Sequence, residues 1–105
     1  MDPEILERLI EQGRDGYEAR LAAGQAWLKR DQVERALTHL IKATQMGPER
    51  TMAWQELGRA HRIAGQSDQA RSAWQTGMEV AGNNGDKQAE KVMGVWLKRL
   101  GPDDS

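Results

Sequence analysis

The segment TMAWQELGRAHRIAGQSDQARSAWQTGMEVAG, residues 51–82, decides the fold because it repeats an earlier stretch of the same chain. Moved back by 34 positions, it overlays residues 17–48. The overlay brings five identical pairs together, which are Ala19 with Ala53, Gly24 with Gly58, Ala26 with Ala60, Gln32 with Gln66 and Ala36 with Ala70. A fixed period of this length is the sequence signature of a stacked repeat array. We therefore interpret the chain as two copies of one structural unit.

Each copy predicts two helices separated by a short break. The first helix of the first copy runs to about Arg30, and Gly47-Pro48 stops the second helix. In the second copy, Gly65 breaks the helix pair and the second helix ends near Gly82. Apolar residues at helical spacing form one face of the second helix in the first copy, namely Val33, Ala36, Leu37, Leu40, Ile41 and Ala43. The pattern predicts an all-α fold.

Acidic residues mark the expected helix starts. Asp15 with Glu18, and Asp31 with Glu34, have the spacing of capping boxes, in which side-chain oxygens accept hydrogen bonds from free N–H groups of the first turn. Thr51 is the expected N-cap at the start of the second copy.

The flanking segments extend the helical pattern at both ends. Asp2-Pro3 starts a short helix over residues 3–12, and the 34-residue shift places its Leu6 on Leu40, in the second helix of a unit. Residues 86–100 form an amphipathic helix, with one face made of Ala89, Val92, Met93, Trp96 and Leu100. Residues 101–105 are expected to be a mobile tail.

Composition excludes several classes of function. The 105 residues contain 15 basic and 16 acidic side chains, so the net charge of −1 does not indicate a polyanion-binding protein. The chain has no cysteine, which excludes disulfides and thiolate chemistry and fits a reducing compartment. No segment has the length and apolarity of a signal peptide or membrane span. We expect a cytoplasmic protein that does not bind membranes.

Candidate sites for chemistry have simpler structural interpretations. Four tryptophans are compatible with a stacking platform for nucleic-acid bases or with an aromatic cage, but Trp27, Trp54 and Trp74 fall on expected core positions. His39 and His61 lie on different helices, without the spacing of a metal site. Residues 82–87 open a helix but lack the spacing of a phosphate-binding loop. We expect no catalytic residues, no metal and no cofactor.

The second copy carries a family signature. The motif Trp54-x2-Leu57-Gly58-x2-His61, followed by Ala70-x3-Trp74, resembles the tetratricopeptide repeat, with His where Tyr is usual and Trp where Phe is usual. The first copy matches more loosely, through Gly24, Trp27, Ala36, Leu40, Ala43 and Pro48. The chain is also similar to small stand-alone bacterial members of this family with a Gly-Asp-Lys-Gln turn, here residues 85–88, before a basic, aromatic last helix.

The resemblance implies a short right-handed solenoid of about six helices in antiparallel pairs. Residues 17–48 and 51–82 are the two repeats, and helices 3–12 and 86–100 cap them within a single domain of residues 1–100. The first helices of successive repeats would then line a concave groove, where a peptide or partner helix binds. The family's groove positions fall here on Leu21, Gln25, Leu28, Lys29, Met52, Gln55, Arg59, Arg62, Met93 and Trp96, with Glu18, Ile63 and Ala89 beside them.

This groove predicts a non-enzymatic interaction module, an adaptor or scaffold for a protein or peptide partner. Arg59 and Arg62 lie on one face of a helix, three positions apart, and favour a mildly acidic segment with an apolar anchor. An alternative is a structural protein that assembles with other copies of itself through the groove or the last helix. Nucleic-acid binding is disfavoured by the balanced charge.

Overall fold

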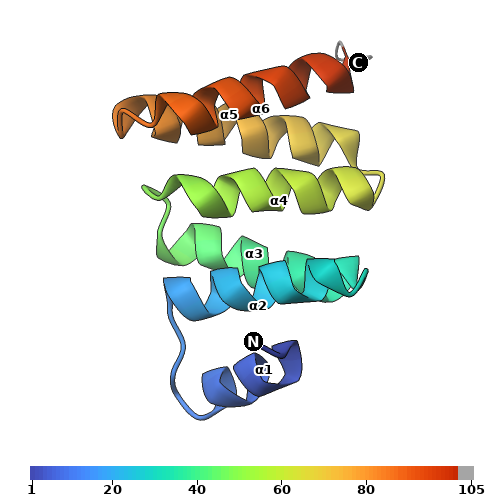
Figure 1. The fold of residues 1–105 in the computed structure, drawn as a ribbon, viewed down its shortest axis with the longest axis vertical. Helices are drawn as coiled ribbons and strands as arrows, with labels where there is room; N and C mark the ends of the chain where they lie inside the picture. Colours follow the sequence, from blue (N-terminus) through green and yellow to red (C-terminus); the bar gives the residue numbers. More distant parts are fainter. Residues whose placement is uncertain (102–105) are drawn as a thin grey trace.

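The computed structural model describes residues 1–101, which form six α-helices stacked in layers along the long axis (Figure 1). Their bounds are α1 Pro3–Glu11, α2 Tyr17–Lys29, α3 Val33–Met46, α4 Thr51–Ile63, α5 Ser67–Asn83 and α6 Lys87–Leu100. The molecule measures 42 × 29 × 20 Å, with α1 at one end and α6 at the other (Figure 1). The expected all-α repeat architecture is confirmed. The tail predicted to be mobile lies, from residue 102 onward, outside the described residues.

The helices pack in the order that the repeats predict. The pairs α2 with α3 and α4 with α5 form the most extensive interfaces, and α3 packs on α4 to join the repeats. Within the described part of the chain, α1 packs mainly on α2, while α6 packs on α5 and α4. The two flanking helices therefore occupy the ends of the stack, as the sequence indicates.

Glycines in the first helix of each repeat let the paired helix approach closely. A Cβ added at Gly24 would lie 2.5 Å from the Leu40 side chain, and one at Gly58 would lie 2.6 Å from Cε2 of Trp74 and closer still to Nε1. Leu40 and Trp74 are both fully buried. The two equivalent large side chains thus fill two equivalent notches, which explains why the repeats place glycine inside a helix despite its cost of about 0.5–1 kcal/mol relative to alanine.

The core follows the repeats in two clusters. The first joins α2, α3, α4 and α5 through Trp27, Ala36, Leu37, Leu40, Leu57, Ala60 and Ala73. The second joins α5 and α6 through Ala70, Trp74, Ala81 and Met93. Trp54, predicted to be a core residue, is only partly buried, and its indole N–H donates to the carbonyl of Pro48 at 2.9 Å. The core consists mainly of alanine, leucine and tryptophan. The alanines allow the helices to stack closely, and the leucine and tryptophan side chains fill the space between them.

Two predicted capping boxes are wrong. The residue before α2 is Gly16 and the residue before α3 is Gln32, and neither makes a side-chain capping hydrogen bond. Asp15 instead accepts from Arg20 Nε at 2.7 Å. Asp31 has a φ of 58°, the left-handed conformation that Gly65 adopts in the second repeat with a φ of 77°.

The conformation of Asp31 ends α2 rather than starting α3. The N–H of Gln32 donates to the carbonyl of Trp27 at 3.0 Å, and the N–H of Asp31 donates to Leu28 at 3.0 Å. These bonds form the C-terminal motif that usually ends in glycine, and aspartate is one of the few other residues that tolerate the required backbone angles. The same bonds recur after α4 around Gly65.

The starts of the other helices agree with the predicted caps only in part. Asp2 caps α1 by accepting from the Glu4 N–H at 3.2 Å, as predicted. Asp86 caps α6 by accepting from the Ala89 N–H at 3.1 Å. Thr51 is the first helical residue of α4, so the expected N-cap is displaced by one position to Arg50.

Tyr17 connects the two repeats. Its hydroxyl accepts from the Ala53 N–H at 3.3 Å, and its ring occupies the space that a side chain at Gly47 would need. The Arg50 guanidinium lies 4.2 Å above the ring centre. Burial raises the pKa of the Tyr17 hydroxyl. These contacts fix α2 against the start of α4 and so set the relative position of two helices that line the groove.

Candidate binding groove

The first helix α4 packs on both α2 and α6, and two hollows open between these three helices on the face where the groove is expected. The arginine pocket lies between α4 and α6, has a volume of about 310 Å³, and is lined by Arg59, Arg62, Trp96, Arg99 and Leu100. The α2–α4 pocket has a volume of about 300 Å³ and is lined by Gln25, Leu28, Lys29, Glu56, Arg59 and Ile63. Arg59 lines both hollows.

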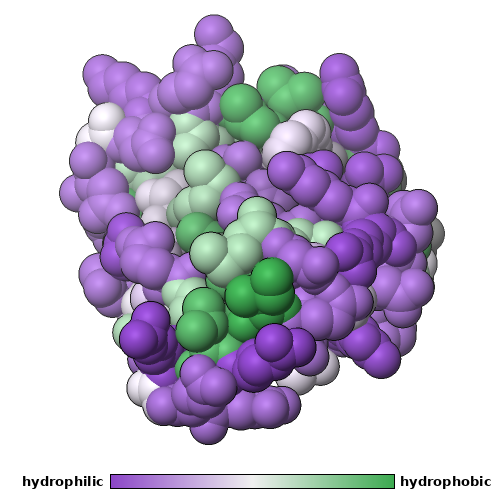
Figure 2. All heavy atoms as spheres, turned by 60° about the horizontal axis from the view of Figure 1, so that its bottom comes forward, coloured by the Kyte–Doolittle hydropathy of each residue, from purple (hydrophilic) through white to green (hydrophobic). Residues whose placement is uncertain are grey.

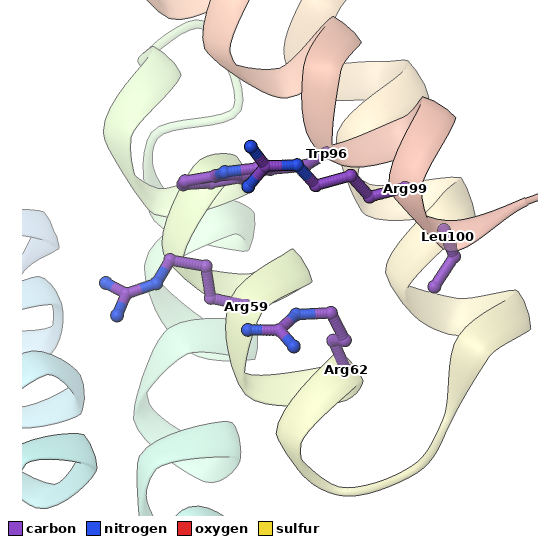
Figure 3. Close-up of a pocket in the computed structure, with 5 residues that line it drawn as sticks. All are labelled: Arg59, Arg62, Trp96, Arg99 and Leu100. Atoms are coloured by element: carbon purple, nitrogen blue, oxygen red, sulfur yellow. The ribbon is translucent and has the colours of Figure 1, made fainter.

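The arginine pocket combines an aromatic ring with three guanidinium groups. Figure 3 shows Arg59 and Arg62 extending from α4, and Trp96, Arg99 and Leu100 extending from α6. The Trp96 ring is half-buried and packs on buried Trp74, with ring centres 5.3 Å apart and planes tilted by 47°. Core packing therefore holds Trp96 in place while part of the ring remains accessible in the pocket.

The ionisable residues that line the two hollows are cations, except for the buried carboxylate of Glu56. Glu56 is 7% exposed, and its two oxygens accept from Arg59 Nη1 at 2.9 and 3.2 Å. Arg62 and Arg99 make no ion pair within the part of the chain that the structure describes, and both are exposed. The pocket thus offers two guanidinium groups whose hydrogen-bond donors are available to an anionic ligand.

Six of the ten predicted groove residues line the two hollows. They are Gln25, Leu28, Lys29, Arg59, Arg62 and Trp96. The others lie elsewhere on or beneath the surface: Leu21 packs against the first core cluster, Met52 is 42% exposed outside the hollows, and Gln55 uses its carbonyl to accept from the Trp74 indole. The groove prediction is therefore consistent with the hollows at α2 and α4, and less so at α6.

Met93 is fully buried, which corrects its assignment to the groove. The prediction carried the 34-residue period from α4 into α6, but these helices begin at Thr51 and Lys87, which is 36 residues apart. In the observed register Met93 corresponds to Leu57, a core residue that is 6% exposed. Gly77 leaves the space that the Met93 sulfur occupies. Met93 belongs to the core between α5 and α6.

Three lining residues were not predicted. The sequence pattern places Leu100 on the apolar face of the last helix, and neither Arg99 nor Glu56 is among the predicted groove residues. The spacing of Trp96 and Arg99, three positions apart on one helix face, is the signal that places them together. Glu56 and Arg59 have the same spacing, and they form an ion pair.

A polar cluster outside the groove holds α1 in place. The Glu7 carboxylate accepts from Trp27 Nε1 at 2.7 Å and from His39 Nε2 at 3.0 Å. Arg20 bonds both Asp15 and Nδ1 of His39, and because a guanidinium only donates, Nε2 carries the ring hydrogen. The hydrogen bond from His39 lowers the pKa of Glu7, and the hydrogen bond from Arg20 lowers the pKa of Asp15. The cluster joins α1, α2 and α3.

The structure describes no group that would hold a metal ion. Within residues 1–101, no three His, Asp or Glu side chains come together in a metal-binding arrangement. No helix in this range has the length and apolarity needed to cross a bilayer.

Comparison with known proteins identifies the family. The chain is 38% identical over 97 residues to the TPR repeat-containing protein PA0015 of Pseudomonas aeruginosa, a match that spans 92% of each chain. This chain belongs to the tetratricopeptide repeat family. The fold is also similar to the solution structure of protein BPP2914 from Bordetella parapertussis, with a TM-score of 0.80 and 35% identity over 93% of this chain and 85% of that one. No family model matches the sequence.

Membership of the tetratricopeptide repeat family fits the two glycine notches and the arrangement of the groove. Proteins of this family are in general protein-interaction modules without enzymatic activity. The family thus indicates a protein partner, while the character of that partner depends on the side chains of this particular groove.

Proposed function

We propose that this chain is a non-enzymatic adaptor whose groove binds a mildly acidic partner segment with an apolar anchor. The observation that carries the proposal is the arginine pocket, where Arg62 and Arg99 flank the accessible part of Trp96. A large apolar side chain of the partner would pack on Trp96. Carboxylates next to it would accept hydrogen bonds from the two guanidinium groups.

The charges around the groove support an acidic partner. Arg59, Arg62, Arg99 and Lys29 line the two hollows, and among the lining residues only Glu56 carries a negative charge. Glu56 already neutralises Arg59. The remaining cations favour carboxylates, because guanidinium groups bind them through two parallel hydrogen bonds.

The dimensions of the groove support an extended or helical segment rather than a small molecule. The two hollows of about 310 and 300 Å³ lie next to each other, with Arg59 in the lining of both. A segment lying across α2, α4 and α6 would place one apolar residue in each hollow. Leu28 and Ile63 provide apolar contacts in the α2–α4 pocket.

A random peptide library selected on the immobilised protein tests the proposal. Selected peptides should carry Asp or Glu close to a large apolar residue. Their affinity is then measured by calorimetry on the wild type and on the double variant Arg62→Glu, Arg99→Glu. Each lost charge-assisted hydrogen bond is worth about 1.5–3 kcal/mol, so the Kd should rise at least about tenfold for each arginine that contacts the peptide.

The variants are chosen to separate binding from folding. Arg59 is left intact because its removal would leave the buried Glu56 carboxylate without a partner. The matched control is Arg14→Glu, Lys42→Glu, which makes the same change of charge at two exposed residues outside the groove. Peptides without carboxylates, or equal affinity for both double variants, would contradict the proposal.

A further inference from the structure

The two ends of the helix stack are complementary halves of one repeat. In the observed register Gly94 of α6 is equivalent to Gly24 of α2 and Gly58 of α4. Gly24 and Gly58 are buried beneath Leu40 and Trp74 of the following helices, whereas Gly94 is half-exposed. A Cβ at Gly94 would meet only the end of the Met78 side chain, at 3.5 Å. The notch of α6 is therefore open among the described residues.

A hollow of about 470 Å³ covers this open notch. It is lined by Met78, Lys87, Glu90, Lys91, Gly94, Val95 and Lys98, and Val95 is 41% exposed. In the register that aligns Gly94 with Gly58, Lys91 corresponds to Gln55, whose carbonyl accepts from the Trp74 indole. The hollow thus lies where the second helix of a repeat packs in the complete units.

At the opposite end, α1 is a second helix that packs on no first helix of its own. The residues equivalent to Ile5 in α3 and α5 are His39, 7% exposed, and Ala73, 5% exposed, but Ile5 itself is 44% exposed. Figure 2 turns this end of the molecule forward and shows hydrophobic residues gathered among hydrophilic ones. Leu6, the residue equivalent to Leu40 and Trp74, is only 8% exposed and is already packed within its own molecule, so Ile5 is the exposed apolar side chain of this end.

The two ends carry opposite charges. Residues 2–11, with α1, contain four carboxylates and one arginine, and Arg30 pairs with two of these carboxylates, Asp2 and Glu4, so four carboxylates face two arginines at this end. Residues 87–100 contain four cations and one carboxylate. Lys87, Lys91 and Lys98 surround the hollow on α6, and none of them makes an ion pair within residues 1–101. Approach of the α1 end of one molecule to the α6 end of another is therefore electrostatically favourable.

We propose that α1 of a second copy docks in the hollow on α6, so that the two helices complete a repeat between molecules. Ile5 of the second copy covers Gly94 and Val95, and the lysines face the acidic end of α1. The contact is head-to-tail, so it leaves a free end on each molecule and generates chains rather than a closed symmetric dimer. A contact between single helices buries less than the about 800 Å² per partner of a stable interface, so the association is weak.

This contact uses the ends of the stack, and it is independent of the groove function proposed above.

Sedimentation velocity of the full chain over a concentration series should show species that grow beyond a dimer. Association should weaken at least tenfold between a low-salt buffer and about 1 M salt, where the Debye length is only about 3 Å. A monomer up to millimolar concentration, a closed dimer, or association that salt does not weaken would overturn the proposal.

Two variants, each blocking one end, test the direction of the contact. Gly94→Leu fills the notch on α6, where the neighbouring space allows a side chain, and Ile5→Arg places a cation on the α1 face. Each variant alone should be monomeric with an unchanged helical circular dichroism spectrum. An equimolar mixture should form a one-to-one dimer and nothing larger, because one free α1 meets one free α6. Association of either variant alone, or a mixture that stays monomeric, would overturn the proposal.

Discussion

Replacing Gly58 with alanine tests whether the helix pairs are held by glycine notches. The added Cβ would lie 2.6 Å from Cε2 of Trp74 and closer to Nε1, whereas carbon atoms in contact prefer about 3.5–4.0 Å. The indole cannot easily move away. It is fully buried, its Nε1 donates to the carbonyl of Gln55 at 3.1 Å, and its ring packs on Trp96.

The expected cost follows from these contacts. Overpacking a rigid core costs about 1–3 kcal/mol, and a weakened Trp74 hydrogen bond adds about 0.5–1.5 kcal/mol. Alanine returns about 0.5–1 kcal/mol through its better helix propensity. We therefore expect Gly58→Ala to lower the free energy of unfolding by about 2 kcal/mol, out of the about 5–15 kcal/mol typical of a domain.

Matched substitutions at the other two notches calibrate the result. At Gly24 the added Cβ meets the end of the Leu40 side chain, which can adjust more easily than an indole, so Gly24→Ala should cost less. At Gly94 it meets only Met78 at 3.5 Å, so Gly94→Ala should stabilise the monomer by about 0.5–1 kcal/mol. Urea denaturation at low protein concentration measures all three. Equal effects at Gly58 and Gly94 would refute the argument that the notch, rather than helix propensity, decides stability.

Four further predictions concern the core, the end helix and the backbone. Trp74→Ala removes a fully buried indole and should lower the free energy of unfolding by about 3–5 kcal/mol in chemical denaturation. The fragment 1–85 lacks α6 and exposes the second core cluster, so it should aggregate or lose cooperative thermal unfolding. The folded state lowers the pKa of Glu7 below its ordinary value of 4.5, so the stability that Glu7 contributes is present above pH 4.5 and is lost as the pH falls through the folded-state pKa. The difference in the free energy of unfolding between wild type and Glu7→Gln should therefore shrink in acid. Asp31→Gly relieves a left-handed backbone with a φ of 58° and should raise the melting temperature.

The repeat architecture could be predicted from the sequence because its signal is redundant. The period, the glycine and alanine positions, and the breaks at Gly47-Pro48 and Gly65 each indicate the same helix pairs, and the structure has them. The helix starts were less predictable. A carboxylate near a helix start can cap it, pair with a neighbour, or sit in the preceding turn, and these outcomes have similar energies. Asp2 does the first, Asp15 the second and Asp31 the third.

The errors at the last helix share one physical cause. The helix α5 has 17 residues and α3 has 14, but the connection after α5 (residues 84–86) is one residue shorter than that after α3 (residues 47–50), so α6 is moved by a net two positions relative to a strict 34-residue repeat. A shift of two positions turns a helix by about 200°, which exchanges its buried and exposed faces. Met93 therefore lies in the core instead of the groove, and Gly94 takes the notch position. The same shift places three lysines around that notch, which stays open because no further helix packs on α6 among residues 1–101. The head-to-tail contact is inferred from this feature.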